Sequence, residues 1–172
     1  MVVQILIPLL TILLSGLVAT VVTHYLATSH QEKQFRRQKL EELYFSMDGF
    51  CTWFVAFNAY WPGVMDSKID YHTALNKQIE IGSDKKNERN HQTAEMLVNI
   101  YFPALLPNFD AIMARRDSVN EIFSAFRKQY KTSGPDESNR KFIAPLNQAM
   151  RDFDAEHSRF NHQLFKIAKA IH

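Results

Sequence analysis

The stretch "LIPLLTILLSGLVATVVTHYLATSHQEKQFRRQKLEELYF", from Leu6 to Phe45, changes character near Ser29. Before Ser29 it is apolar with a few small hydroxyl side chains, and after it the side chains are charged. From Val2 to Ala27 there is no Asp, Glu, Lys or Arg. A helix of that length reaches roughly 39 Å, which exceeds the roughly 30 Å hydrocarbon core of a bilayer. The stretch therefore predicts a transmembrane helix over residues 1–28 and a separate domain over residues 29–172.

Two other interpretations of the apolar segment stay open. A buried helix of a soluble domain is usually shorter and shows a polar stripe. A cleaved signal peptide would explain the small residues in "VAT" and "LAT". However, Met1 to Gln4 include no Lys or Arg, and the apolar run is longer than a usual signal-peptide core. We expect the segment to stay attached.

Four basic residues follow the apolar segment directly, and we call them the basic collar: Lys33, Arg36, Arg37 and Lys39. Because Lys and Arg are in excess on the cytoplasmic flank of a span, the collar predicts a single-pass membrane protein of defined orientation. Its N-terminus would lie outside and its C-terminal domain in the cytoplasm. Each collar residue near anionic headgroups contributes about 1 kcal/mol of attraction, so membrane lipid is an expected partner.

Small and polar residues of the apolar segment recur at steps of three and four and share one helical face. Small residues four positions apart let two membrane helices approach closely. This pattern predicts that the spans associate, although Ser and Thr also bond to their own helix backbone. The candidate association residues are Gln4, Thr11, Ser15, Gly16, Ala19, Thr20 and Thr23.

Large apolar residues beyond the collar recur at spacings of three and four, which is typical of amphipathic helices. The first such seam comprises Leu40, Leu43, Met47, Phe50, Phe54, Phe57 and Trp61. We expect Pro62 and Gly63 to end this helix. Four further aromatic residues lie off the seam, so either several helices surround this one or an aromatic patch faces a partner. These are Tyr44, Phe45, Trp53 and Tyr60.

A shorter pattern of Ile69, Leu75 and Ile79, with Tyr71 or His72, predicts a second helix, capped by Asp66 or Ser67. The polar stretch 82–92 reads as an exposed loop that leads into the next helix.

The prolines of "YFPALLP", Pro103 and Pro107, are expected to break or kink that helix. A stripe from Phe109 to Tyr130 follows. The last seam runs from Leu146 to Ile171 with a period of 3.5 residues, which predicts shallow packing angles. The expected fold class is all-α: an N-terminal transmembrane helix followed by an antiparallel helical bundle.

Composition argues against several classes of function. The net charge is only +2, with 20 basic and 18 acidic side chains, so nucleic acid is not expected as a main partner. The single cysteine, Cys51, lies among aromatic residues and is expected to pack as a small apolar group. No phosphate-binding, dinucleotide-binding, zinc-protease or nucleophile-elbow motif occurs. We therefore expect no catalytic site and no cofactor.

Two carboxylate-x-x-His pairs resemble half of a bundle metal site: Glu88 with His91, and Asp154 with His157. A complete site would need two more inward carboxylates, such as Glu41 and Asp48. The sequence therefore does not favour a metal site. A histidine on a seam is more often held by a neighbouring hydroxyl or carbonyl, although His157 would then titrate as a buried group.

The stretches "RRQKLEELY", Arg36 to Tyr44, and "NIYFPALLP", Asn99 to Pro107, follow an N-terminal span. In this arrangement the chain resembles a loose set of uncharacterised bacterial single-span membrane proteins. The resemblance implies an inner-membrane protein with a helical cytoplasmic domain and carries over no catalytic or binding residue. Some small anchored helical proteins of this shape act as membrane effectors in anti-phage systems, which is an analogy of architecture alone.

Two functions compete. The first is a membrane-anchored, non-enzymatic interaction module that self-associates, as a homo-oligomer, or binds a partner protein at the inner membrane surface. The alternative is a membrane-perturbing effector, pore-forming or depolarising, of the kind found in antiviral defence. In that case the stripe of small residues would line a cluster of spans. A single span rarely forms a pore alone, so both functions predict an oligomer or a partner.

Overall fold

The computed structural model describes the backbone of residues 2–83 and 86–171; the side chains of residues 2–22, 25–26 and 86–88 lie outside the description. Within these limits the chain is all-α and has no strand, as the sequence predicts. Two short 3-10 segments, η1 and η2, join the longer helices. The elements are α1 (Val2–Asn58), α2 (Trp61–Met65), α3 (Tyr71–Gly82), α4 (Lys86–Tyr101), η1 (Pro103–Leu105), α5 (Leu106–Ser133), η2 (Glu137–Phe142) and α6 (Ile143–Ala170).

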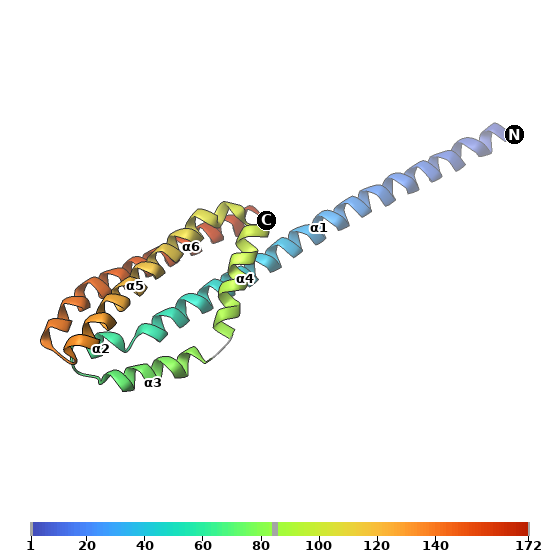
Figure 1. Cartoon of the computed structure of the whole chain (residues 1–172). Coiled ribbons are helices and arrows are strands. Elements are labelled where there is room, and N and C mark those ends of the chain that lie inside the picture. The colour runs from blue at the N-terminus through green and yellow to red at the C-terminus, as the bar shows by residue number, and fades with distance from the viewer. Residues whose placement is uncertain (1, 84–85, 172) are drawn as a thin grey trace.

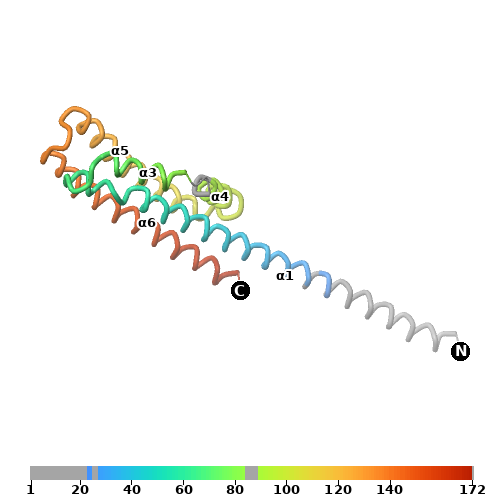
Figure 2. The backbone as a smooth tube through the Cα atoms, turned by 90° about the horizontal axis from the view of Figure 1, so that it is seen from below, coloured from blue at the N-terminus to red at the C-terminus, as the bar shows by residue number. Residues whose placement is uncertain are grey.

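Helix α1 continues without a break from the apolar segment into the bundle (Figure 1). The described side chains from Thr23 to Gln38 are exposed, except that of the half-buried Ser29, and burial begins at Leu40. Toward its N-terminus, the described part of α1 extends beyond the other helices (Figure 2). The described part of α1 before Leu40 is thus largely exposed, and the part from Leu40 onward is a core element.

The heptad seam of α1 forms the centre of the core, as its spacing predicts. Five of its six residues on α1 are at most 4% exposed: Leu40, Leu43, Met47, Phe50 and Phe54. Trp61 is fully buried as well, whereas Phe57 is half-buried. Each buried large side chain contributes about 1.5 to 3 kcal/mol relative to exposure. These residues make α1 the element around which the others pack.

Helices α3, α4 and α6 pack against the bundle half of α1. Helix α6 runs antiparallel to α1, whereas α4 crosses α1 steeply (Figure 1). Gly49 lies at this crossing: a Cβ atom there would come within 2.5 Å of the Asn90 side-chain nitrogen. The glycine therefore leaves room for the Asn90 side chain between the two helices.

Two details of the first loop region differ from the prediction. Helix α1 ends at Asn58, and Pro62, rather than ending that helix, lies in the first turn of the separate short helix α2. Proline is favoured there because the first helical N–H groups have no partner within the helix. Helix α3 is capped by Asp70, not by Asp66 or Ser67.

The buried face of α3 is also not the expected one. Ile79 is 61% exposed, whereas Ala74 and Gln78 are buried. Gln78 is buried because its amide bonds the Phe57 carbonyl and the Arg127 guanidinium, which a hydrophobic pattern does not reveal.

The second half of the chain forms a helical hairpin. The two prolines break the chain as expected: α4 ends at Tyr101, and α5 starts with Pro107 in its first turn. Helix α5 ends before Gly134, whose φ of 65° lies in the region that favours glycine. The seam of α6 is confirmed at its centre. Its fully or nearly buried members are Leu146, Phe153, Phe160 and Leu164.

Within the described part of the chain, no single helix combines the length and the apolar character that a membrane crossing needs; the helix pair Arg89–Tyr101 and Pro103–Ser133, bent by 117°, meets both criteria only when taken together. The predicted span over residues 1–28 lies, as far as its side chains are concerned, largely outside the described residues.

Candidate functional site: a groove beside the basic collar

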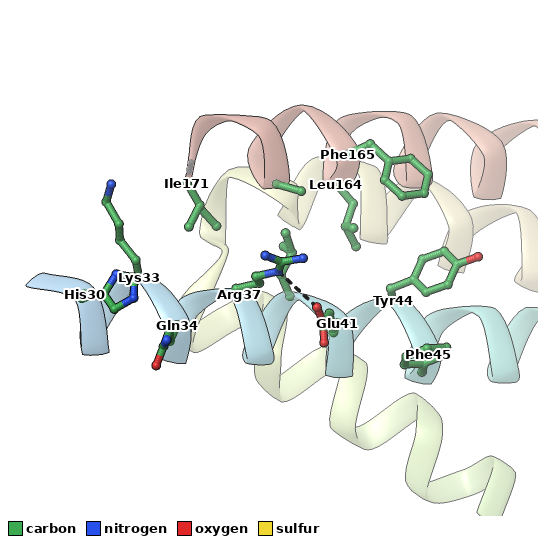
Figure 3. Close-up of a pocket in the computed structure, with 12 residues that line it drawn as sticks. His30, Lys33, Gln34, Arg37, Glu41, Tyr44, Phe45, Leu164, Phe165 and Ile171 are labelled. Carbon is green, nitrogen blue, oxygen red and sulfur yellow. Dashed lines mark hydrogen bonds and ion pairs between the residues drawn. The ribbon is translucent and has the colours of Figure 1, made fainter.

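A groove of about 670 Å³ lies between α1 and the C-terminal end of α6 (Figure 3). We call it the α1–α6 groove. It starts at the point where α1 leaves the bundle and extends about four helical turns along α1. Its lining residues are His30, Lys33, Gln34, Arg37, Leu40, Glu41, Tyr44 and Phe45 from α1, with Leu164, Phe165, Ala168 and Ile171 from the end of the chain.

The floor of the groove is apolar. Leu40 and Leu164 are each 3% exposed, and Leu164 and Ile171 point toward α1 in Figure 3. Two phenylalanines remain largely uncovered at one end: Phe45 is 70% exposed and Phe165 is 52% exposed. Exposed phenylalanines that adjoin an apolar floor are typical of a surface that another molecule covers.

Tyr44 connects these two phenylalanines. Its ring centroid lies 5.4 Å from that of Phe45 and 5.9 Å from that of Phe165. Such edge and tilted ring contacts hold aromatic side chains in defined positions. The aromatic end of the groove is therefore ordered by its own contacts, across two helices.

The rim of the groove carries both signs of charge. The Arg37 Nε atom donates a hydrogen bond of 3.3 Å to the Glu41 carboxylate, one turn further along α1. The two side chains are 63% and 61% exposed, so solvent screens this pair and its contribution to stability is small. Lys33 also lines the groove. Arg37 and Glu41 can therefore form ion pairs with charged residues of another molecule instead of with each other.

The structure divides the predicted basic collar. Lys33 and Arg37 line the groove, whereas Arg36 is exposed and does not. Lys39 lies on another side of α1, where its Nζ atom is 2.7 Å from the Glu42 carboxylate. This hydrogen bond raises the pKa of Lys39.

Lys39 also belongs to an aromatic cluster between α1 and α4. Its Nζ atom lies 5.8 Å from the centre of the Phe35 ring and 5.9 Å from that of the Tyr101 ring. Cation–π contacts of this length are attractive. Because Phe35 is itself 46% exposed, α1 presents uncovered aromatic surface on both of its flanks near the collar.

Of the candidate association residues in the apolar segment, the structure describes the side chain of one. Thr23 is exposed on α1. The side chains of the other candidates lie outside the described residues: Gln4, Thr11, Ser15, Gly16, Ala19 and Thr20. Association through this stripe stays a prediction.

The two histidines of the carboxylate-x-x-His pairs have protein partners. His91 lies among aromatic rings, 5.1 Å from Phe50 and 5.9 Å from Phe109, and burial lowers its pKa. His157 Nε2 lies 3.1 Å from the Asn161 amide nitrogen, and burial lowers its pKa too. Among the side chains that the structure describes, no three His, Cys, Asp or Glu residues come together to hold a metal ion.

Cys51 is buried, 2% exposed, as expected for a thiol that packs as a small apolar group. Burial is the main cause that raises its pKa far above the ordinary value, and the nearby Asp48 and Asp154 raise it further. A thiol that stays protonated is a poor nucleophile. This cysteine is a core residue.

Sequence reasoning identified the collar but missed the apolar half of the groove. Phe165 falls between the seam positions Leu164 and Ile167 and therefore carries no periodic signal. The available signal was the aromatic excess around Tyr44 and Phe45, for which a partner-facing patch was one interpretation. Part of that excess is packed inside, since Trp53 donates a hydrogen bond to the Ile81 carbonyl, whereas Phe45 is exposed.

Comparison of the chain with protein-family models, with curated proteins and with solved structures finds no match.

Proposed function

We propose that this protein is a membrane-anchored, non-enzymatic helical module that self-associates through the α1–α6 groove. The apolar segment, residues 1–28, crosses a bacterial inner membrane with its N-terminus outside. The bundle, residues 29–172, lies on the cytoplasmic side, and the basic collar contacts anionic headgroups. The other possible occupant of the groove is a different protein, and the test below distinguishes it from a second copy.

The observation that carries this proposal is the continuity of α1. One helix contains the apolar segment, the exposed collar and the central seam of the core. Because an unbroken helix has no hinge, its two ends keep a fixed position relative to each other. An anchored N-terminal half therefore holds the groove directly at the membrane surface, next to the residues that contact it.

The shape and charge of the groove support a second copy as its occupant. Two copies anchored in the same membrane have parallel α1 helices. Around a two-fold axis, the same segment of α1 in each copy therefore lies at the same distance from the membrane. Because a two-fold interface is reciprocal, Arg37 of each copy can pair with Glu41 of the other, one turn away. The exposed rings of Phe45 and Phe165 supply the apolar surface that such an interface buries.

The test is self-association of the full chain in cells, measured by co-purification of two differently tagged copies from detergent-solubilised membranes. We expect Phe45→Glu to reduce co-purification by about tenfold or more, because a charge in an apolar interface is left unpaired. The matched control is Val55→Glu. Val55 lies on the same helix, is 42% exposed and does not line the groove.

Equal loss in both variants, or no loss in either, contradicts the groove as the site of self-association. If the wild-type copies do not co-purify at all, but a photo-reactive amino acid at Phe45 crosslinks the chain to one different protein, the occupant is a partner. A photo-reactive amino acid in place of the exposed Glu121 of α5 serves as the control for this crosslinking experiment. The membrane-perturbing alternative depends on the stripe of small residues in the span, whose side chains, except that of Thr23, lie outside the described residues.

A further inference from the structure

A second cavity, of about 570 Å³, lies where α1 ends, between α1, α3 and α5. We call it the α5 cavity. Its volume is within the range of about 300 to 1,000 Å³ that is usual for small-molecule sites. Among the described residues its lining includes three cations and three amide side chains and no carboxylate: Arg127, Lys128 and Lys131, with Asn58, Gln78 and Asn120.

Arg127 is held in a fixed position. Its Nη2 atom donates a hydrogen bond of 2.9 Å to the Gln78 side-chain oxygen, and its Cζ atom lies 4.9 Å from the centre of the Trp61 ring. Gln78 is itself 6% exposed and donates a second hydrogen bond, of 3.5 Å, to the Phe57 carbonyl. A guanidinium held in this way has less freedom to lose when a ligand binds.

The positive charge of the α5 cavity is not neutralised locally. Lys128 and Lys131 are exposed and lie within about one helical turn of Arg127 on α5. None of the three takes part in an ion pair with a described carboxylate. Cations that converge on a concave surface attract anions, and most strongly groups with several charged oxygens.

A structural role explains part of this arrangement. The C-terminal carbonyls of α1, around Phe57 and Asn58, carry partial negative charge, which a nearby arginine offsets. That role accounts for Arg127 and Gln78. It does not account for Lys128 and Lys131, which are exposed on the mouth of the same cavity.

We propose that the α5 cavity binds the phosphate groups of a small phosphorylated molecule, such as a nucleoside polyphosphate. The phosphates lie against Arg127, Lys128 and Lys131, and the exposed amide of Asn120 supplies a further hydrogen bond. The half-buried ring of Phe57 provides an apolar wall for the organic part of the ligand. This site is independent of the membrane anchor and of the α1–α6 groove.

Isothermal titration of the full chain in detergent micelles tests the proposal, with ATP and inorganic pyrophosphate as probes and adenosine as the uncharged control. EDTA is present throughout, so that no metal ion bridges the phosphates. We expect both phosphate probes to bind at one site per chain and adenosine not to bind. The variant Lys128→Ala with Lys131→Ala is expected to weaken phosphate binding by about tenfold or more, because two charge-assisted contacts are lost.

The matched control is Lys166→Ala with Lys169→Ala. These lysines have the same spacing, are exposed on α6 and do not line the α5 cavity, so the variant changes the net charge equally. We expect its binding and its thermal midpoint to match those of the wild type. The proposal is overturned if neither phosphate probe binds at millimolar concentration. It is equally overturned if both double variants weaken binding alike, or if adenosine binds as tightly as ATP.

Discussion

At the scale of single residues, His157 links the packing of the bundle to pH. Its side chain is 14% exposed, and burial lowers its pKa more than the neighbouring Asp48 and Asp154 raise it. The folded state therefore favours the neutral imidazole. Stability from this group is complete above the unfolded-state pKa of about 6.5 and is lost as the pH falls below it.

We expect the free energy of unfolding in urea to fall between pH 7.5 and pH 5.0. His91 adds to this fall, since burial and the nearby Arg116 lower its pKa while Glu95 raises it in part. In His157→Gln the fall should be smaller than in the wild type, and in the control His162→Gln, at an exposed position, it should be unchanged. An equal fall in His157→Gln and wild type would refute this assignment.

The lowered pKa values of Asp66, Asp70 and Asp136 act in a lower pH range. Hydrogen bonds to the ionised carboxylates are the main cause in each case: from Lys68, from Thr73 and from Ser138. Their stabilising effect is present above the ordinary carboxyl pKa and disappears only at more acidic pH. Between pH 7.5 and pH 5.0 the change in the free energy of unfolding therefore reports on the histidines and not on these three carboxylates.

Phe153 is a core residue whose loss should be severe. It is fully buried, and its ring centroid lies 4.8 Å from that of Phe54 on α1. Phe153→Ala is expected to reduce the free energy of unfolding by about 3 to 5 kcal/mol, since it removes apolar contact and leaves a cavity. Phe165→Ala, on the same helix but 52% exposed, should cost less than about 1.5 kcal/mol. Urea unfolding of both variants checks the difference.

At the scale of elements, the short helix α3 depends on its cap. The Asp70 carboxylate accepts hydrogen bonds from the backbone N–H groups of His72 and Thr73, at 2.8 and 3.1 Å. These are two of the donors that lack a partner within the helix. Asp70→Ala should lower the urea midpoint, whereas Asp70→Asn should stay close to the wild type because an amide oxygen still caps. A midpoint for Asp70→Ala equal to that of the wild type would show that the cap contributes nothing.

The long helices could be predicted because their buried faces repeat at a regular spacing. The seams of α1 and α6 are examples, and Pro103 and Pro107 mark the break between α4 and α5. The short helices could not be predicted equally well. In α3 the buried face includes Gln78, which is inside because of its hydrogen bonds, while the apolar Ile79 is outside.

The candidate groove depends on which helix packs beside α1, and local sequence does not contain that information. The collar residues Lys33 and Arg37 were identified from their position after the apolar segment. Leu164, Phe165 and Ile171 reach the same groove from the other end of the chain, about 130 residues away, because α6 runs antiparallel to α1. Only the tertiary fold brings these two groups together.

At the scale of the whole molecule, α1 joins the proposed membrane anchor to the core. The described collar segment of α1 is largely exposed and the part from Leu40 onward forms the centre of the bundle, and one unbroken helix contains both (Figure 1). The α1–α6 groove lies at the junction and the α5 cavity at the far end of the same helix. The proposed functions of these two surfaces therefore act at opposite ends of the bundle.

Alkaline carbonate extraction of membranes from cells that produce the full chain with a C-terminal tag tests directly whether the N-terminal part of α1 anchors the protein in the bilayer. A protein held by a spanning helix stays in the membrane pellet, because carbonate removes only proteins bound by charge or by other proteins. We expect the tagged chain in the pellet, at its full length including residues 1–28. Its release into the supernatant, or a mature chain that starts beyond Ala27, would contradict the account.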